Sequence, residues 1–63
     1  MAALVSVAEQ AAAQYREFAR RLRREAYEAA ATGRPVEAQR LRYLAMRTEH
    51  AADAELAPRE SLS

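Results

Sequence analysis

A short segment near the middle of the chain, Thr32-Gly33-Arg34-Pro35, constrains the fold more than any other feature. Gly33 can adopt the left-handed backbone conformation that ends a helix. Pro35 suits the first position of a following helix, where the backbone N–H has no helical partner. A connection this short makes the flanking helices run antiparallel and touch. We therefore expect a helical hairpin with its turn at residues 32–35.

The residues on both sides of this turn favour helices. Seventeen of the 63 residues are Ala, and Glu, Arg, Leu and Gln supply much of the remainder, all of them strong helix formers. Ser6 and Glu9 have the spacing of a capping box, in which each side chain accepts from the other residue's backbone N–H. Pro58 ends the second helical pattern. The sequence predicts an all-α fold with helices at about residues 6–31 and 35–56.

Apolar residues recur at intervals of three and four, which gives each predicted helix an apolar stripe. The stripe of the first helix comprises Ala8, Ala11, Ala12, Tyr15, Phe18, Ala19, Leu22, Ala26, Ala29 and Ala30. The stripe of the second comprises Ala38, Leu41, Leu44, Ala45, Thr48, Ala51, Ala52 and Leu56. Small side chains near the turn predict that the helices lie closest together there. We expect one hairpin domain over residues 1–57 and a disordered tail over residues 58–63.

The predicted core is small. Its large side chains are Tyr15, Phe18, Leu22, Leu41, Leu44 and Leu56. Below roughly 70–80 residues a single core seldom supplies more than about 3–5 kcal/mol without a disulfide, a metal or a partner chain. The chain has no Cys, so disulfides are excluded.

Pairing with a second copy is the most available source of further burial, and a two-fold dimer is the commonest arrangement. We expect a homodimer that forms a four-helix bundle. A second apolar strip on the second helix (Val36, Tyr43, Met46 and His50) is more than one partner helix requires. The predicted interface comprises Tyr15, Phe18, Leu22, Val36, Tyr43 and Met46. Folding on a different protein is the other possibility. The expected function is that of a small interaction protein acting in assembly or as an adaptor.

A nucleic-acid-associated regulator is the alternative, because all ten basic residues are Arg and Arg binds phosphate bidentately. The phosphate contacts of that alternative would be Arg16, Arg20, Arg23, Arg24, Arg40 and Arg47. The arginines of the first helix are interleaved with glutamates, which weakens the local field. A solvated face crossed by ion pairs at four-residue spacing, such as Glu17–Arg21 and Arg24–Glu28, is the preferred interpretation.

The sequence offers little for catalysis or for binding a cofactor. It has one His, one Asp, no Cys and no Lys, so arrangements of nucleophile, base and orienting group are nearly unavailable. Glu49, His50 and Asp53 bring possible metal donors together, but metal sites usually need three or four ligands and no second His exists. We expect no enzyme activity, no cofactor and no metal. Without a secretory signal or an apolar run of membrane-spanning length, we expect a cytoplasmic protein that does not bind membranes.

Overall fold

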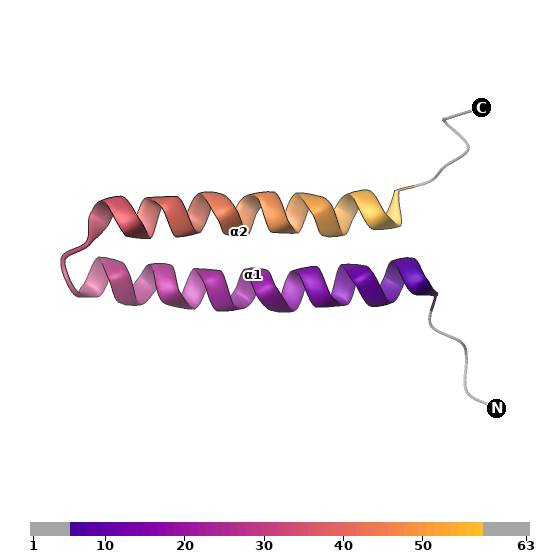
Figure 1. The fold of residues 1–63 in the computed structure, drawn as a ribbon, viewed down its shortest axis with the longest axis horizontal. Helices are drawn as coiled ribbons and strands as arrows, with labels where there is room; N and C mark the ends of the chain where they lie inside the picture. Colours follow the sequence, from indigo (N-terminus) through magenta and orange to yellow (C-terminus); the bar gives the residue numbers. More distant parts are fainter. Residues whose placement is uncertain (1–5, 58–63) are drawn as a thin grey trace.

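The computed structural model describes residues 6–57, and within this range the chain forms two α-helices and no strand (Figure 1). Helix α1 spans Val7–Ala31 and helix α2 spans Pro35–Leu56. The helices lie side by side and antiparallel, joined by one tight turn. The predicted all-α hairpin is confirmed. The predicted tail at residues 58–63 lies outside the described part of the chain.

Helix α1 begins at the predicted capping box. Ser6 Oγ accepts a hydrogen bond from the Glu9 N–H at 3.0 Å, and Glu9 Oε1 accepts from the Ser6 N–H at 3.2 Å. The two bonds satisfy backbone donors that the first turn of a helix leaves without a partner. A purely local pattern thus sets the start of the helix.

The turn ends α1 in a Schellman arrangement. Gly33 has a φ of 77°, its N–H donates to the Ala30 carbonyl at 3.2 Å, and the Arg34 N–H donates to the Ala29 carbonyl at 2.8 Å. These bonds satisfy carbonyls at the end of the helix. Pro35 then occupies the start of α2. The roles predicted for Gly33 and Pro35 are confirmed.

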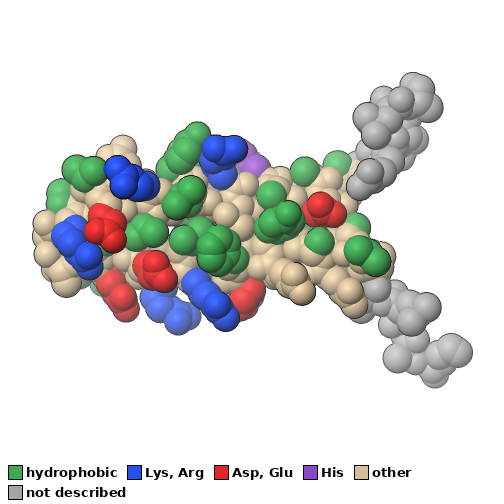
Figure 2. Space-filling model, viewed as in Figure 1, with side chains coloured by type: hydrophobic (Ala, Val, Ile, Leu, Met, Phe, Trp, Pro, Cys, Tyr) green, Lys and Arg blue, Asp and Glu red, His purple; other side chains and the backbone are tan. Residues whose placement is uncertain are grey.

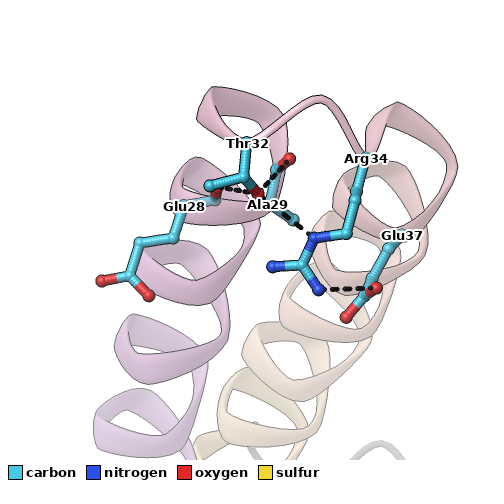
Figure 3. Close-up of polar contacts among 5 residues, drawn as sticks. All are labelled: Glu28, Ala29, Thr32, Arg34 and Glu37. Carbon is cyan, nitrogen blue, oxygen red and sulfur yellow. Dashed lines mark hydrogen bonds and ion pairs between the residues drawn. The ribbon is translucent and has the colours of Figure 1, made fainter.

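Side chains reinforce the same turn (Figure 3). Thr32 Oγ1 donates to the carbonyls of Glu28 and Ala29, at 2.9 and 3.2 Å. The Arg34 guanidinium donates through Nε to Thr32 Oγ1 and contacts the Glu37 carboxylate at 3.3 Å. Arg34 therefore links the end of α1 to the first turn of α2.

The two helices meet along a row of alanines, which we call the alanine seam. Its members are at most 1% exposed and recur every seventh residue: Ala12, Ala19 and Ala26 on α1, and Ala38, Ala45 and Ala52 on α2. Ala19 and Ala45 pack in one cluster, so the equal spacing places Ala26 opposite Ala38 and Ala12 opposite Ala52. A seven-residue repeat keeps the same side of each helix facing its partner, as in a coiled coil.

The structure corrects the predicted core. Of its six large members, Leu22 alone is buried, at 7% exposed, and Leu41 is partly buried against the same cluster. The other four are between 39% and 53% exposed: Tyr15, Phe18, Leu44 and Leu56. Small side chains along the seam let the backbones approach closely, which leaves no room for large ones between them.

The seam is buried evenly from the turn to the other end of the hairpin, and closest packing near the turn stays a prediction. Ala12 and Ala52, which lie at the end of the hairpin away from the turn, are as fully buried as Ala26 and Ala38. Alanine contacts therefore hold the helices together along the whole seam, because the seven-residue repeat continues to both ends.

Candidate interaction surface

The alanine seam has two sides, and ion pairs between the helices mark one of them. A helix turns by about 100° per residue. A residue four positions after a seam alanine therefore lies about 40° to one side, and a residue three positions after lies about 60° to the other. Arg23 follows Ala19 by four, Glu49 follows Ala45 by four, and these two side chains are in contact. On both helices, the residues that lie four positions after a seam alanine therefore face the same side of the hairpin.

The ion-pair face is defined by Arg16 and Arg23 of α1 with Asp53 and Glu49 of α2. Arg23 binds Glu49 bidentately, from Nε at 2.9 Å and from Nη2 at 2.7 Å, and Arg16 contacts Asp53 at 3.6 Å. The hydrogen bonds from Arg23 lower the pKa of Glu49 and raise that of Arg23. The four side chains are between 41% and 72% exposed, so solvent screens both pairs and they orient the helices more than they stabilise them.

The opposite side of the seam carries the large apolar side chains and is here called the apolar face. Tyr15 and Leu22 follow seam alanines by three positions, as Leu41 does on α2, while Phe18 and Leu44 each precede one by a single position. Tyr15, Phe18 and Leu44 are 39%, 53% and 43% exposed. Leu22 and Leu41 are less exposed than these three side chains and pack against the cluster of Ala19 and Ala45.

Charges avoid the centre of the apolar face. The carboxylates on this side of the seam are Glu25 and Glu37 near the turn and Glu55 at the other end. Figure 2 shows hydrophobic side chains gathered over both helices along the middle of the hairpin, with most charged side chains toward its borders. Burying an unpaired charge is costly. A partner that covers the centre of the apolar face avoids this cost.

A third surface lies on the side of α2 that points away from α1, and we call it the outer stripe. Val36, Gln39, Tyr43, Met46 and His50 recur at alternating intervals of three and four residues, and all five are exposed. Tyr43 is 54% exposed, and the Arg47 guanidinium carbon lies 5.9 Å from the centre of its ring, within the range of a cation–π contact.

The structure divides the predicted interface residues between these surfaces. Tyr15, Phe18 and Leu22 lie together on the apolar face, although Leu22 is occupied mainly in the contact between the helices. Val36, Tyr43 and Met46 lie on the outer stripe of α2. Leu44, a predicted core residue, joins the first group. One flat partner surface cannot cover both groups at once.

The six predicted phosphate contacts are likewise dispersed. Arg16, Arg20 and Arg23 each contact a carboxylate, of Asp53, Glu17 and Glu49 respectively. The remaining three are exposed on the outward sides of different helices: Arg24 on α1, and Arg40 and Arg47 on α2. The arginines therefore form no single basic patch.

The predicted four-residue ion pairs within α1 are wrong. Glu17 is bound by Arg20, three positions away, and this hydrogen bond lowers the pKa of Glu17. Among the described residues Arg21, Arg24 and Glu28 make no ion pair. For a long exposed side chain, ion pairs with neighbours three and four positions away have similar free energies. Spacing alone therefore does not determine which pair forms.

The possible metal donors do not converge. Residues 6–57 contain no group of three or more His, Cys, Asp or Glu side chains placed to hold a metal ion. Glu49 and Asp53 face arginines of α1, whereas His50 is exposed on the outer stripe. Neither α1 nor α2 is long and apolar enough to cross a membrane.

Comparisons of the chain with protein-family models, with curated protein sequences and with solved structures find no match. The surfaces of the hairpin are therefore the basis for inferring its function.

Proposed function

We propose that this chain is a non-enzymatic assembly module whose apolar face binds the same face of a second copy. Two hairpins joined in this way would form a four-helix bundle, in which Tyr15, Phe18 and Leu44 of each copy lie between the paired hairpins. A two-fold dimer uses one patch twice, so one apolar face is sufficient.

The observation that carries this proposal is that small side chains are buried between the helices while large apolar side chains are exposed. Within the described residues no large side chain is fully buried, while three large apolar ones are exposed together on one face. A core of alanines and one leucine removes little apolar area from water, and burial scales with that area. For a chain of 63 residues, burial against a partner is the direct way to add stability.

A matched pair of substitutions on α1 tests the proposal. Phe18 and Tyr27 are both exposed aromatic residues, at 53% and 77%, but Tyr27 follows Ala26 by one position and lies on the other side of the seam. Phe18→Arg would place a charge in the proposed contact, where it has no partner. Tyr27→Arg adds the same charge outside it.

Sedimentation velocity reports the outcome as mass. We expect about 14 kDa, twice the 7.0 kDa of one chain, for the unaltered protein and for Tyr27→Arg. Phe18→Arg should sediment as a single chain, whether or not the separated hairpin keeps its helices by circular dichroism. A Phe18→Arg protein that remains dimeric would refute the proposed face, as would equal dissociation of both variants.

A further inference from the structure

The outer stripe of α2 is a second row with the spacing of a helix-binding surface. Val36, Tyr43 and His50 are seven residues apart, and Gln39 and Met46 fall between them at three- and four-residue steps. Such alternation presents one continuous line to a second helix. α1 cannot cover this line, because the alanine seam lies on the opposite side of α2.

Two arginines flank the Val36–His50 part of this side of α2. Arg40 precedes Tyr43 by three positions and Arg47 follows it by four, so both flank the stripe on the same edge. Among the described residues neither is in an ion pair, whereas Glu49 and Asp53 face the arginines of α1. The other two carboxylates of α2, Glu37 and Glu55, lie toward the apolar face. The stripe positions from Val36 to His50 include no carboxylate, and Asp53, the next position of the same spacing, contacts Arg16 of α1 at 3.6 Å.

We infer that the outer stripe binds an amphipathic helix of another protein whose apolar row is flanked by Asp or Glu. Val36, Tyr43 and Met46 would pack against the apolar row of that helix. Arg40 and Arg47 would pair with its carboxylates, as charged flanks do when they select coiled-coil partners. Charge complementarity identifies the partner as acidic.

Two other occupants fit this surface less well. A second copy bound through the same stripe would bring Arg40 and Arg47 of one chain toward those of the other, and like charges oppose such pairing. Single-stranded nucleic acid is held by several aromatic side chains on which successive bases stack. The stripe offers one aromatic residue, Tyr43, between two aliphatic ones.

The inference goes beyond self-association and does not require it. The outer stripe points away from α1, while the apolar face spans both helices on one side of the seam. Both surfaces can therefore be occupied together. A dimer joined through its apolar faces would present two outer stripes, which is the arrangement of an adaptor that brings two copies of an acidic partner together.

The test uses a fluorescent peptide of about four heptads, with Leu at positions a and d and Glu at e and g. A second peptide has Lys in place of each Glu, and a fluorescent oligothymidylate strand represents nucleic acid. Fluorescence anisotropy measures the binding of each probe to the full chain at moderate salt. We expect the acidic peptide to bind and the basic peptide not to bind.

Two double variants locate the surface. Arg40→Glu with Arg47→Glu reverses the charge beside the stripe, and we expect it to weaken binding of the acidic peptide by about tenfold or more. Arg21→Glu with Arg24→Glu changes net charge equally on the outward side of α1, where both residues are exposed, and should leave binding nearly unchanged. Tyr43→Ala should weaken binding without altering charge.

Several results would overturn the inference: no binding of the acidic peptide, equal weakening by both double variants, or binding of the oligothymidylate in place of the peptide. Sedimentation distinguishes failure of this inference from failure of the proposed self-association. If the Arg40/Arg47 variant or Tyr43→Ala dissociates the dimer, the outer stripe is the contact between copies and the inference is wrong. If the unaltered chain is monomeric yet binds the peptide through the stripe, the inference stands and the proposed dimer does not.

Discussion

The alanine seam and the apolar face are neighbouring apolar surfaces of one hairpin, and they differ chiefly in side-chain size. The seam contains small side chains that are at most 1% exposed, whereas Phe18 and Leu44 beside it remain about half exposed. Small side chains fix how closely and in which register two helices pack. Large side chains contribute most of the area that a partner can remove from water. The seam determines the shape of the hairpin, and under the proposed function the apolar face is the contact between two copies.

Enlarging a seam residue should have the largest effect. Ala45 is 0% exposed and packs beside Ala19, so Ala45→Leu would force the helices apart. Overpacking of this kind costs about 1–3 kcal/mol. Ala54→Leu, on the exposed outward side of α2, should stay within about 0.5 kcal/mol of the unaltered chain. Urea unfolding followed by circular dichroism, at one fixed protein concentration, measures both. Equal stability of the two variants would show that the seam is not tightly packed.

Truncating the apolar face should weaken association more than it changes the fold. We expect Leu44→Ala to raise the dimer dissociation constant by about tenfold or more, because both copies lose apolar area. Tyr43→Ala, at the adjacent position, removes a larger side chain from the outer stripe and should leave the constant nearly unchanged. Sedimentation equilibrium over a range of concentrations gives both values. A larger effect at Tyr43 would reverse the assignment of the two surfaces.

Changing the turn should lower the stability of the hairpin, and this result does not distinguish the alanine seam from the apolar face. A Cβ added at Gly33 would meet nothing within 4 Å, but its φ is +77°. The cost of Gly33→Ala is therefore confined to the backbone, at about 1–2 kcal/mol. Gly33→Asn should cost less, since Asn tolerates this conformation better. Thermal unfolding ranks the three proteins. An Ala variant as stable as the unaltered chain would indicate that the turn changes conformation to accept it.

The ion-pair face should give the smallest effect, and one that depends on pH. The bond from Arg23 lowers the pKa of Glu49 below its usual 4.5, so the folded state favours the carboxylate. The stabilisation is present above the unfolded-state pKa and is lost as pH falls through the folded-state value. Glu49→Gln should melt slightly below the unaltered chain at pH 7, and the difference should vanish in acid. A difference that persists at a pH well below the folded-state value would need another cause.

The sequence predicts the parts of the fold that depend on local chemistry. The capping box needs Ser6 and Glu9 alone, and the turn needs a glycine that tolerates positive φ followed by a proline. Each signal acts over a few residues, so no knowledge of the partner helix is required. The two helices and their antiparallel arrangement follow from these signals.

The side of each helix that faces its partner was harder to predict. Phe18 and Ala19 are adjacent, as are Leu44 and Ala45, so one apolar stripe contains both members of each pair. Weighting by hydrophobicity places the larger member in the core, whereas close helix packing selects the smaller. The recurrence of alanine every seventh residue was the available signal. The cross-helix partners of Arg16 and Arg23 had no comparable signal, because they depend on the register between helices.

The mass and helix content of the unaltered chain, measured together on dilution, decide whether two hairpins fold as one unit. Sedimentation equilibrium with circular dichroism at matched concentrations should give about 14 kDa, twice the single-chain 7.0 kDa, while the protein is helical. Under the proposal, helix content should fall as the dimer dissociates, because the alanine seam removes little apolar area from water. A fully helical species of 7.0 kDa at micromolar concentration would contradict the account.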